Sequence, residues 1–220
     1  MKSAVKPNVP ISEPSPQELR VVLLGDSLAA GTGDETGGGI AGRLPKYLSA
    51  PAFELGDLTN LGVKGAQTTD VLERIRKDRA RTVIGKSNVV ILSIGANDLF
   101  RTQAAREQTM RSPFRAAEAI LEKIAGVISE IERINPSTRI LILGAYNPVP
   151  RQPFGPMLDS YLPVWDETLS ARFNDRSHIQ VVMMSDLVTP KRLSRLDSFH
   201  PGGEAYEEAA KRIASMLGNN

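Results

Sequence analysis

Residues with the chemistry to activate a serine stand near the two ends of the sequence. Ser27 follows a glycine and an aspartate at the end of an apolar run, and His200 comes three residues after Asp197. A serine hydroxyl is a poor nucleophile until a base accepts its proton. On one tight turn, the Asp197 carboxylate can hold one ring nitrogen of His200 and leave the other to face Ser27. These residues predict acyl transfer, with a turn or cap role for Asp197 and a half-buried loop histidine as the alternatives.

The other histidine of the chain, His178, stands in a different place. It precedes the apolar run 179–184, at the N-terminal end of an expected strand. Ligands of open parallel sheets bind outside the C-terminal ends of the strands. We therefore interpret His178 as a surface residue.

Acyl transfer also requires hydrogen-bond donors for the oxyanion that develops on the substrate. Asn97 lies in Gly-Ala-Asn-Asp, after the apolar run 89–94, and offers a side-chain amide. Gly65 offers a backbone N–H, and a glycine lets the backbone approach a substrate closely. The N–H of Ser27 is a third donor. Helix capping by Asn97 and by the adjacent Asp98, and a plain turn at Gly65, are the alternatives.

Short apolar runs and amphipathic segments alternate along the chain. The runs rich in Val, Ile and Leu predict strands buried on both faces of a parallel sheet, and they span residues 19–24, 89–94, 140–144 and 179–184, with a weaker edge strand at 53–61. Apolar residues at a helical period predict helices over 69–77, 114–134, 158–173 and 203–217.

This alternation predicts an α/β fold, a three-layer α/β/α sandwich around a five-stranded parallel sheet. Right-handed crossovers bring the C-terminal ends of the strands to one edge, where ligands bind. We expect one domain over residues 19–220. Residues 1–18 are rich in Pro and Ser and predict a flexible leader, or a stalk left after a signal or anchor is removed.

Composition excludes several classes of function. The 27 basic and 25 acidic residues give a net charge of +2, without a basic run, so we expect no nucleic-acid partner. The absence of cysteine excludes disulfides, thiol nucleophiles and thiolate metal sites. No apolar stretch is long enough to predict a transmembrane helix, and none follows Lys2 as in a signal peptide. The chain as written predicts a cytoplasmic protein, although the leader also fits a secreted or membrane-anchored one. The oligomeric state stays open.

Two segments resemble nucleotide-binding motifs. Residues 37–42 match G-x-G-x-x-G but begin a dozen residues after their strand, so we interpret them as a glycine-rich surface loop. Residues 80–87 match a permissive P-loop, but they follow a charged helix and precede a strand. A P-loop has the reverse context, so we predict a helix-to-strand turn.

Four blocks together resemble the GDSL, or SGNH, hydrolase superfamily, and they occur in order at residues 25–28, 60–65, 95–98 and 197–201. The resemblance implies Ser27 as nucleophile, His200 as base and Asp197 as its partner. It implies Ser27, Gly65 and Asn97 as oxyanion donors. It further implies a flavodoxin-like strand order, 2-1-3-4-5, without metal or cofactor. No G-x-S-x-G pentapeptide occurs, which separates the chain from the α/β-hydrolases.

The expected function is that of a lipase-like or lysophospholipase-like serine esterase, acting on short-to-medium acyl esters through an acyl-enzyme. Its partner would be a small-molecule ester. Residues 99–115 carry arginines that suit an anionic head group, and 146–165 are rich in proline and aromatic residues, as in a partly ordered cap or lid. A carbohydrate O-acetyl esterase is the first alternative. A non-enzymatic module that binds a phosphorylated ligand through residues 25–39 is the second.

Overall fold

The computed structural model describes residues 17–48, 53–173 and 175–218. The expected leader therefore lies outside the described residues, except for its last two. Gln17 and Glu18 already belong to the first strand, because the ladder with the neighbouring strand begins at the pair Gln17–Phe53. The predicted boundary is two residues late, since backbone pairing extends beyond the apolar side chains that mark the strand in the sequence.

Five parallel strands form the sheet, in the order β2-β1-β3-β4-β5. This arrangement confirms both the parallel sheet and the flavodoxin-like order. The strands are β1 (Gln17–Gly25), β2 (Phe53–Gly62), β3 (Val89–Ser93), β4 (Arg139–Leu143) and β5 (Ile179–Val182). The order reverses between β1 and β3, and ligands of such sheets bind at this switch point.

The sheet is buried on both faces, as the continuous apolar runs predict. Alternate residues of a strand point to opposite faces, so Val21 and Leu23 of β1 join one core cluster while Val22 and Leu24 join the other. All five residues of β3 are buried. β2 lies at the edge, as its weaker pattern predicts, and many of its side chains are exposed.

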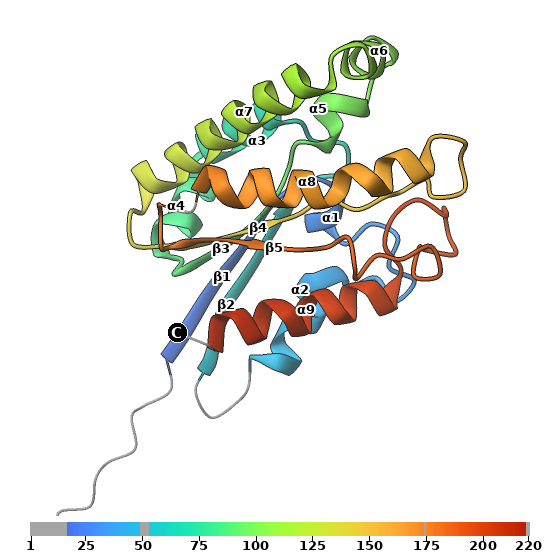
Figure 1. Ribbon diagram of the computed structural model, residues 1–220. Coiled ribbons are helices and arrows are strands. Elements are labelled where there is room, and N and C mark those ends of the chain that lie inside the picture. The colour runs from blue at the N-terminus through green and yellow to red at the C-terminus, as the bar shows by residue number, and fades with distance from the viewer. Residues whose placement is uncertain (1–16, 49–52, 174, 219–220) are drawn as a thin grey trace, which may run out of the picture.

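Helices cover both faces of the sheet (Figure 1). One core cluster holds buried residues of α1 (Ser27–Ala30), α2 (Gly39–Tyr47) and α9 (Gly203–Gly218). The other holds residues of α3 (Thr68–Ile75), α4 (Asp78–Lys86), α7 (Pro113–Ile134) and α8 (Gly155–Phe173). Two shorter helices, α5 (Ala96–Phe100) and α6 (Gln103–Arg111), connect β3 to α7. In the described ranges, no helix has both the length and the apolarity needed to cross a membrane.

One loop interpretation is wrong in part. Residues 37–42 are not simply a surface loop, because α2 begins at Gly39, and Gly39 and Ile40 are buried. Residues 146–165 include the first part of α8, which begins at Gly155, and their role as a cap or lid stays a prediction. The segment that resembles a P-loop lies mostly within α4 and leads into β3, which confirms the helix-to-strand interpretation.

Candidate active site

Ser27 lies just beyond the C-terminal end of β1, after a turn that requires a glycine at position 25. Gly25 has a φ of +135°, and a Cβ there would lie 1.8 Å from the carbonyl oxygen of Ser93 at the end of β3. The chain therefore crosses close over β3, and the N–H of Asp26 donates to the same carbonyl at 2.9 Å. Ser27 follows at once as the first residue of α1.

Asp26 fixes the start of α1 and leaves Ser27 available. Its buried carboxylate accepts hydrogen bonds from the Leu28 N–H at 3.0 Å and from the Ser93 hydroxyl at 2.8 Å. Burial raises the pKa of Asp26, although these hydrogen bonds and the charge of His200 oppose the rise. Because Asp26 caps the helix through Leu28, neither the N–H nor the hydroxyl of Ser27 has a partner among the described residues.

Asp197 and His200 come together on the loop that precedes α9. The Asp197 Oδ2 lies 2.6 Å from the His200 Nδ1. The other oxygen, Oδ1, accepts the N–H groups of Phe199 at 3.0 Å and His200 at 2.9 Å. Ser198, between them, has a left-handed φ of +54°, which closes the turn. Burial alone would raise the pKa of Asp197, but the hydrogen bonds from the His200 ring and the two N–H groups outweigh burial and lower it. The carboxylate therefore stays ionised and holds the Nδ1–H tautomer of the ring.

His200 is nearly buried and lies against the glycine-rich loop 31–38, which connects α1 to α2. Its side chain is 10% exposed. A Cβ on Gly33 would lie 2.5 Å from the His200 Cβ, so the loop backbone packs directly on this residue. The preceding residue, Thr32, donates its N–H to the Ser27 carbonyl at 2.9 Å, so the same loop is also bonded to the serine. Ser27 and His200 thus share one neighbouring loop, although no hydrogen bond joins their side chains in the described parts of the chain. Such bonds are often long without substrate and shorten when it binds.

Asn97 lies in the first turn of α5, and Gly65 lies in the turn between β2 and α3, which α5 contacts. The Asn97 Nδ2 donates to the Ala66 carbonyl at 3.0 Å, which holds the amide and leaves its second hydrogen available. Gly65 has a left-handed φ of +78°, and its N–H has no partner among the described residues. The structure therefore offers three donors without a described partner at the sheet edge, the N–H groups of Ser27 and Gly65 and one amide hydrogen of Asn97.

The neighbouring Asp98 joins these two segments, where the sequence offered it only as a helix cap. Its carboxylate accepts the Thr68 N–H at 2.9 Å and the Thr68 hydroxyl at 2.7 Å. These bonds fasten the start of α3, just after Gly65, to the start of α5, which carries Asn97. Asp98, which is adjacent to Asn97, therefore holds Asn97 and Gly65 in a fixed relative position.

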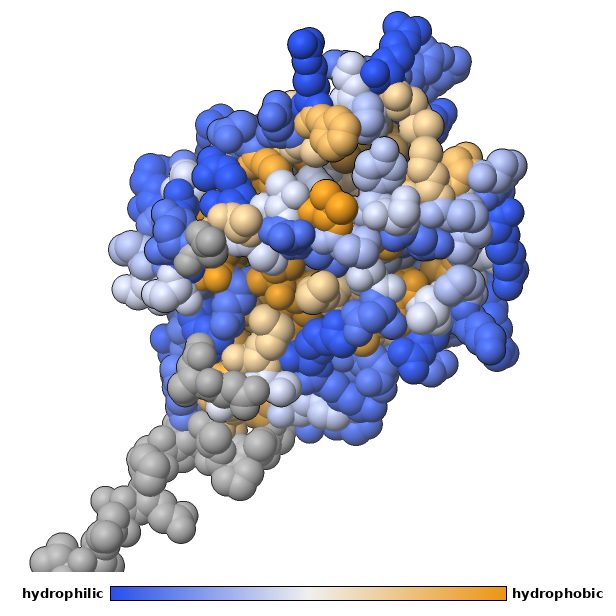
Figure 2. All heavy atoms as spheres, in the orientation of Figure 1, coloured by the Kyte–Doolittle hydropathy of each residue, from blue (hydrophilic) through white to orange (hydrophobic). Residues whose placement is uncertain are grey.

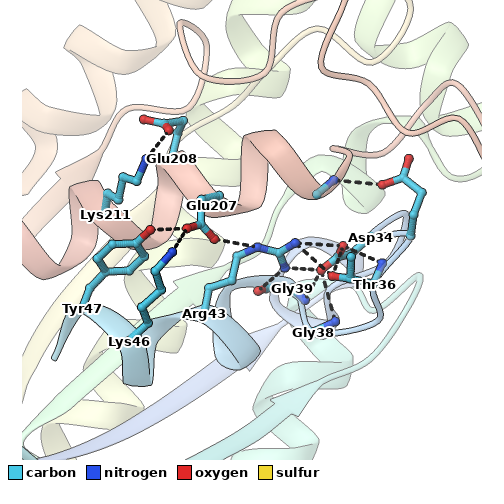
Figure 3. Close-up of polar contacts among 12 residues, drawn as sticks. Asp34, Thr36, Gly38, Gly39, Arg43, Lys46, Tyr47, Glu207, Glu208 and Lys211 are labelled. Carbon is cyan, nitrogen blue, oxygen red and sulfur yellow. Dashed lines mark hydrogen bonds and ion pairs between the residues drawn. The ribbon is translucent and has the colours of Figure 1, made fainter. Parts of the chain in front are cut away.

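The side chain of Asp34 binds the backbone N–H groups of the glycine-rich loop. Figure 3 shows Asp34 turned inward toward the first residues of α2 and Arg43. Its carboxylate accepts the N–H groups of Gly38 at 3.1 Å and Gly39 at 2.7 Å and pairs with Arg43. Burial alone would raise the pKa of Asp34, but the bonds from Arg43, Thr36 and Gly39 hold it well below its usual range. The N–H groups that a phosphate would occupy are therefore already bound.

Glu35, the next residue, holds the His200 loop in place. Its Oε1 accepts the Arg195 N–H at 2.8 Å, and its Oε2 accepts the Gly203 N–H at 3.0 Å. These two residues flank the segment that carries Asp197 and His200. The glycine-rich loop is therefore a brace for that segment. His178, by contrast, pairs with Glu132 at 2.9 Å at the start of β5 and takes no part in this arrangement.

Comparison with known proteins identifies a family for the chain. Residues 23–208 match the model of the GDSL-like Lipase/Acylhydrolase family. The chain belongs to this family. The match contains all four sequence blocks, and the activity common to the family, hydrolysis, applies to this chain.

Relatives of this GDSL-like hydrolase resemble it over most of its length. YpmR of Bacillus subtilis (strain 168) is 29% identical over 214 residues, which are 91% of this chain and 82% of YpmR. The lipase Lip_vut3 from a goat rumen metagenome has a TM-score of 0.72 at 19% identity, over 90% of this chain and 96% of its own. A family 3 carbohydrate esterase of Clostridium thermocellum has a TM-score of 0.63 at 16% identity, over 91% and 99%. At these identities the solved structures show the shared fold.

Two hollows open near the family's hallmark blocks. One, of about 360 Å³, is lined by residues 148–152, 190–191, 193–195 and 198. The other, of about 330 Å³, includes Gly65 and Arg101. Neither Ser27 nor His200 lines either hollow. Figure 2 shows a largely hydrophilic face with scattered apolar side chains.

Proposed function

We propose that the chain is a serine esterase that hydrolyses short-to-medium carboxylic acyl esters through an acyl-enzyme on Ser27. The observation that carries the proposal is the 2.6 Å contact between Asp197 and His200, on a loop that shares the neighbouring glycine-rich loop with Ser27. Membership of a hydrolase family supports it.

In the first step, the Ser27 Oγ attacks the ester carbonyl as the His200 Nε2 takes the hydroxyl proton. The Asp197 carboxylate, bonded to Nδ1, stabilises the imidazolium that forms. Collapse of the tetrahedral intermediate breaks the bond to the alcohol, which leaves with the proton from His200. In the second step, water attacks the acyl-enzyme by the same route, releases the carboxylic acid and restores the Ser27 hydroxyl.

The oxyanion of each tetrahedral intermediate would be held by the N–H groups of Ser27 and Gly65 and by the Asn97 amide. Donors that are already fixed in place stabilise the developing charge without reorganisation. The contact from Asn97 to Ala66 and the clamp by Asp98 supply that rigidity.

A carbohydrate O-acetyl esterase is a second candidate, favoured by one specific observation. The exposed ring of Phe199 lies beside the His200 ring, with centroids 5.1 Å apart, and presents an apolar surface next to the reacting groups. An open site with an exposed aromatic ring suits a sugar better than a long acyl chain. A phosphate-binding module finds less support, because Asp34 occupies the glycine N–H groups that it would need.

The test is hydrolysis of p-nitrophenyl esters from acetate to dodecanoate, with an acetylated oligosaccharide beside them. The wild type, Ser27→Ala and Ser129→Ala should be compared, because Ser129 is an exposed serine on α7. We expect activity in the wild type and in Ser129→Ala and none in Ser27→Ala. A chain-length optimum above acetate favours the acyl esterase, whereas acetate-only activity with deacetylation of the sugar favours the second candidate. Full activity in Ser27→Ala would refute both.

A further inference from the structure

The hollow that includes Gly65 is lined mainly by charged side chains. Its cationic residues are Lys64, Arg74, Lys77 and Arg101, and its carboxylates are Asp70 and Glu73. The four cations exceed the two carboxylates, so the hollow carries a net positive charge. Its volume of about 330 Å³ is enough for a carboxylate or phosphate with a short linking chain.

The cations of this hollow are poorly neutralised by the protein itself. The Arg74 Nε is buried and has no hydrogen-bond partner among the described residues. Within the same residues, Lys64, Arg74 and Lys77 form no ion pair, and Arg101 approaches Asp70 only to 3.9 Å. Asp70 is engaged elsewhere, because it accepts the Gln67 N–H at 2.8 Å. An anion in the hollow would therefore meet cationic side chains of which three have no ion-pair partner in the described parts of the chain.

The hollow is joined to the proposed reaction site by Gly65. This glycine lines the hollow, its N–H is a proposed oxyanion donor, and its carbonyl accepts a hydrogen bond from Arg101 at 3.1 Å. A group bound beside Arg101 would therefore lie next to Gly65, the proposed donor to the oxyanion of the substrate.

We infer that this hollow binds an anionic group, a carboxylate or a phosphate, carried by the ester substrate. The inference rests on the proposed function and narrows its substrate class to anionic esters. Arginine presents N–H donors in a planar fork that matches both groups. An uncharged acyl chain in the same place would leave the cations of the hollow unneutralised.

Two pairs of esters, matched in all but charge, test the inference. Mono-p-nitrophenyl glutarate and p-nitrophenyl pentanoate differ by a carboxylate on the acyl side. Butyryl-glycerol 3-phosphate and monobutyrin differ by a phosphate on the alcohol side. At low ionic strength, we expect the anionic member of at least one pair to have a kcat/KM at least tenfold higher in the wild type, mainly through a lower KM. The pair that shows the preference identifies the side of the ester that carries the anion.

Variants assign that preference to the hollow. Arg74→Gln and Lys77→Gln should each lower the ratio of anionic to neutral kcat/KM by about tenfold. Arg79→Gln removes an exposed cation of α4 outside the hollow and should leave the ratio unchanged. Because Arg74 is partly buried and its loss can affect folding, the exposed Lys77 provides the independent test.

The outcomes separate this inference from the proposed function. Ser27-dependent hydrolysis without preference in either pair would overturn the anionic subsite and keep the esterase. A wild-type preference that survives unchanged in both Lys77→Gln and Arg74→Gln would also overturn it. Hydrolysis of p-nitrophenyl pentanoate that does not depend on Ser27 would overturn the proposed function itself.

Discussion

Replacement of Asp197 by asparagine should stop catalysis while preserving the turn. In the wild type, one carboxylate oxygen accepts the N–H groups of Phe199 and His200, and the other lies 2.6 Å from the His200 Nδ1. The asparagine oxygen can keep the two backbone bonds. Its NH₂ group then faces Nδ1 and donates to it, which places the ring hydrogen on Nε2. A ring protonated on Nε2 cannot accept the proton of Ser27.

The size of the expected fall in kcat follows from the loss of His200 as the base. The wrong tautomer costs about 10⁴ in kcat in a Ser-His-Asp hydrolase of another fold, or about 5 kcal/mol at about 1.4 kcal/mol for each factor of ten. The loss of stability should be much smaller, because one charge-assisted hydrogen bond contributes about 1.5–3 kcal/mol. The Asp197 side chain is 33% exposed, which places the cost at or below the low end of that range.

The assay is kcat on p-nitrophenyl butyrate, measured with thermal unfolding of the same preparations. Asp197→Ala is the matched control, since it also removes the acceptor for both backbone N–H groups. It should lose similar activity and more stability than Asp197→Asn. A folded Asp197→Asn that keeps kcat within tenfold of the wild type would refute the role assigned to Asp197.

Three further substitutions address other parts of the site. Asn97→Ala should lower kcat by about 10²–10³ on p-nitrophenyl butyrate if its amide holds the oxyanion. Asp34→Asn should lower the free energy of unfolding at pH 7 by about 1.5–3 kcal/mol, measured by urea titration, because it removes the charge of a buried carboxylate from Arg43, which keeps its ion pair with Glu207. Since the pKa of Asp34 is lower in the fold than the ordinary value of 3.8, this stability is fully present above that value and is lost as the pH falls below it. Glu35→Gln should lower kcat several-fold with little change in KM, because an NH₂ group then opposes the N–H of Arg195 or Gly203.

Each of these expectations has a contrary result. Normal kcat in a folded Asn97→Ala would remove the amide from the oxyanion site. A stability difference between Asp34→Asn and the wild type that stays constant from pH 7 to pH 3 would mean that the carboxylate is not stabilised by ionisation. Glu35→Gln with unchanged kcat would show that the brace does not position His200, and Glu35→Asp, which keeps the charge on a shorter side chain, would separate charge from reach.

Local patterns in the sequence predicted the elements of the sheet well. Runs of Val, Ile and Leu marked β1, β3, β4 and β5 because parallel strands are buried on both faces, whereas the edge strand β2 had a weaker pattern. The strand order came from the resemblance to a family, since no local pattern encodes which strands are neighbours. The association of Asp197 with His200 was accessible because three residues of one turn separate them.

The contacts of Glu35 and Asp34 in the glycine-rich loop could not be predicted from the sequence in the same way. Glu35 bonds to Arg195 across 160 residues, and nothing in its local sequence indicates that partner. Asp34 and Arg43 are nine residues apart, which spans the loop and the first turn of α2. The glycines in that segment suggested a surface loop, whereas the acidic residues among them determine what the loop does. The cationic hollow likewise combines residues of a loop, a helix and Arg101, and it exists only in the folded chain.

The most direct test of the central claim is covalent labelling by an alkyl fluorophosphonate, whose phosphorus is attacked by an activated serine. Intact mass and peptide mapping should show one adduct per chain, on Ser27, with loss of esterase activity in proportion to labelling. Ser27→Ala should take up no label, and Asp197→Asn should react much more slowly. Labelling of another residue, or esterase activity that persists when Ser27 is fully labelled, would contradict the account.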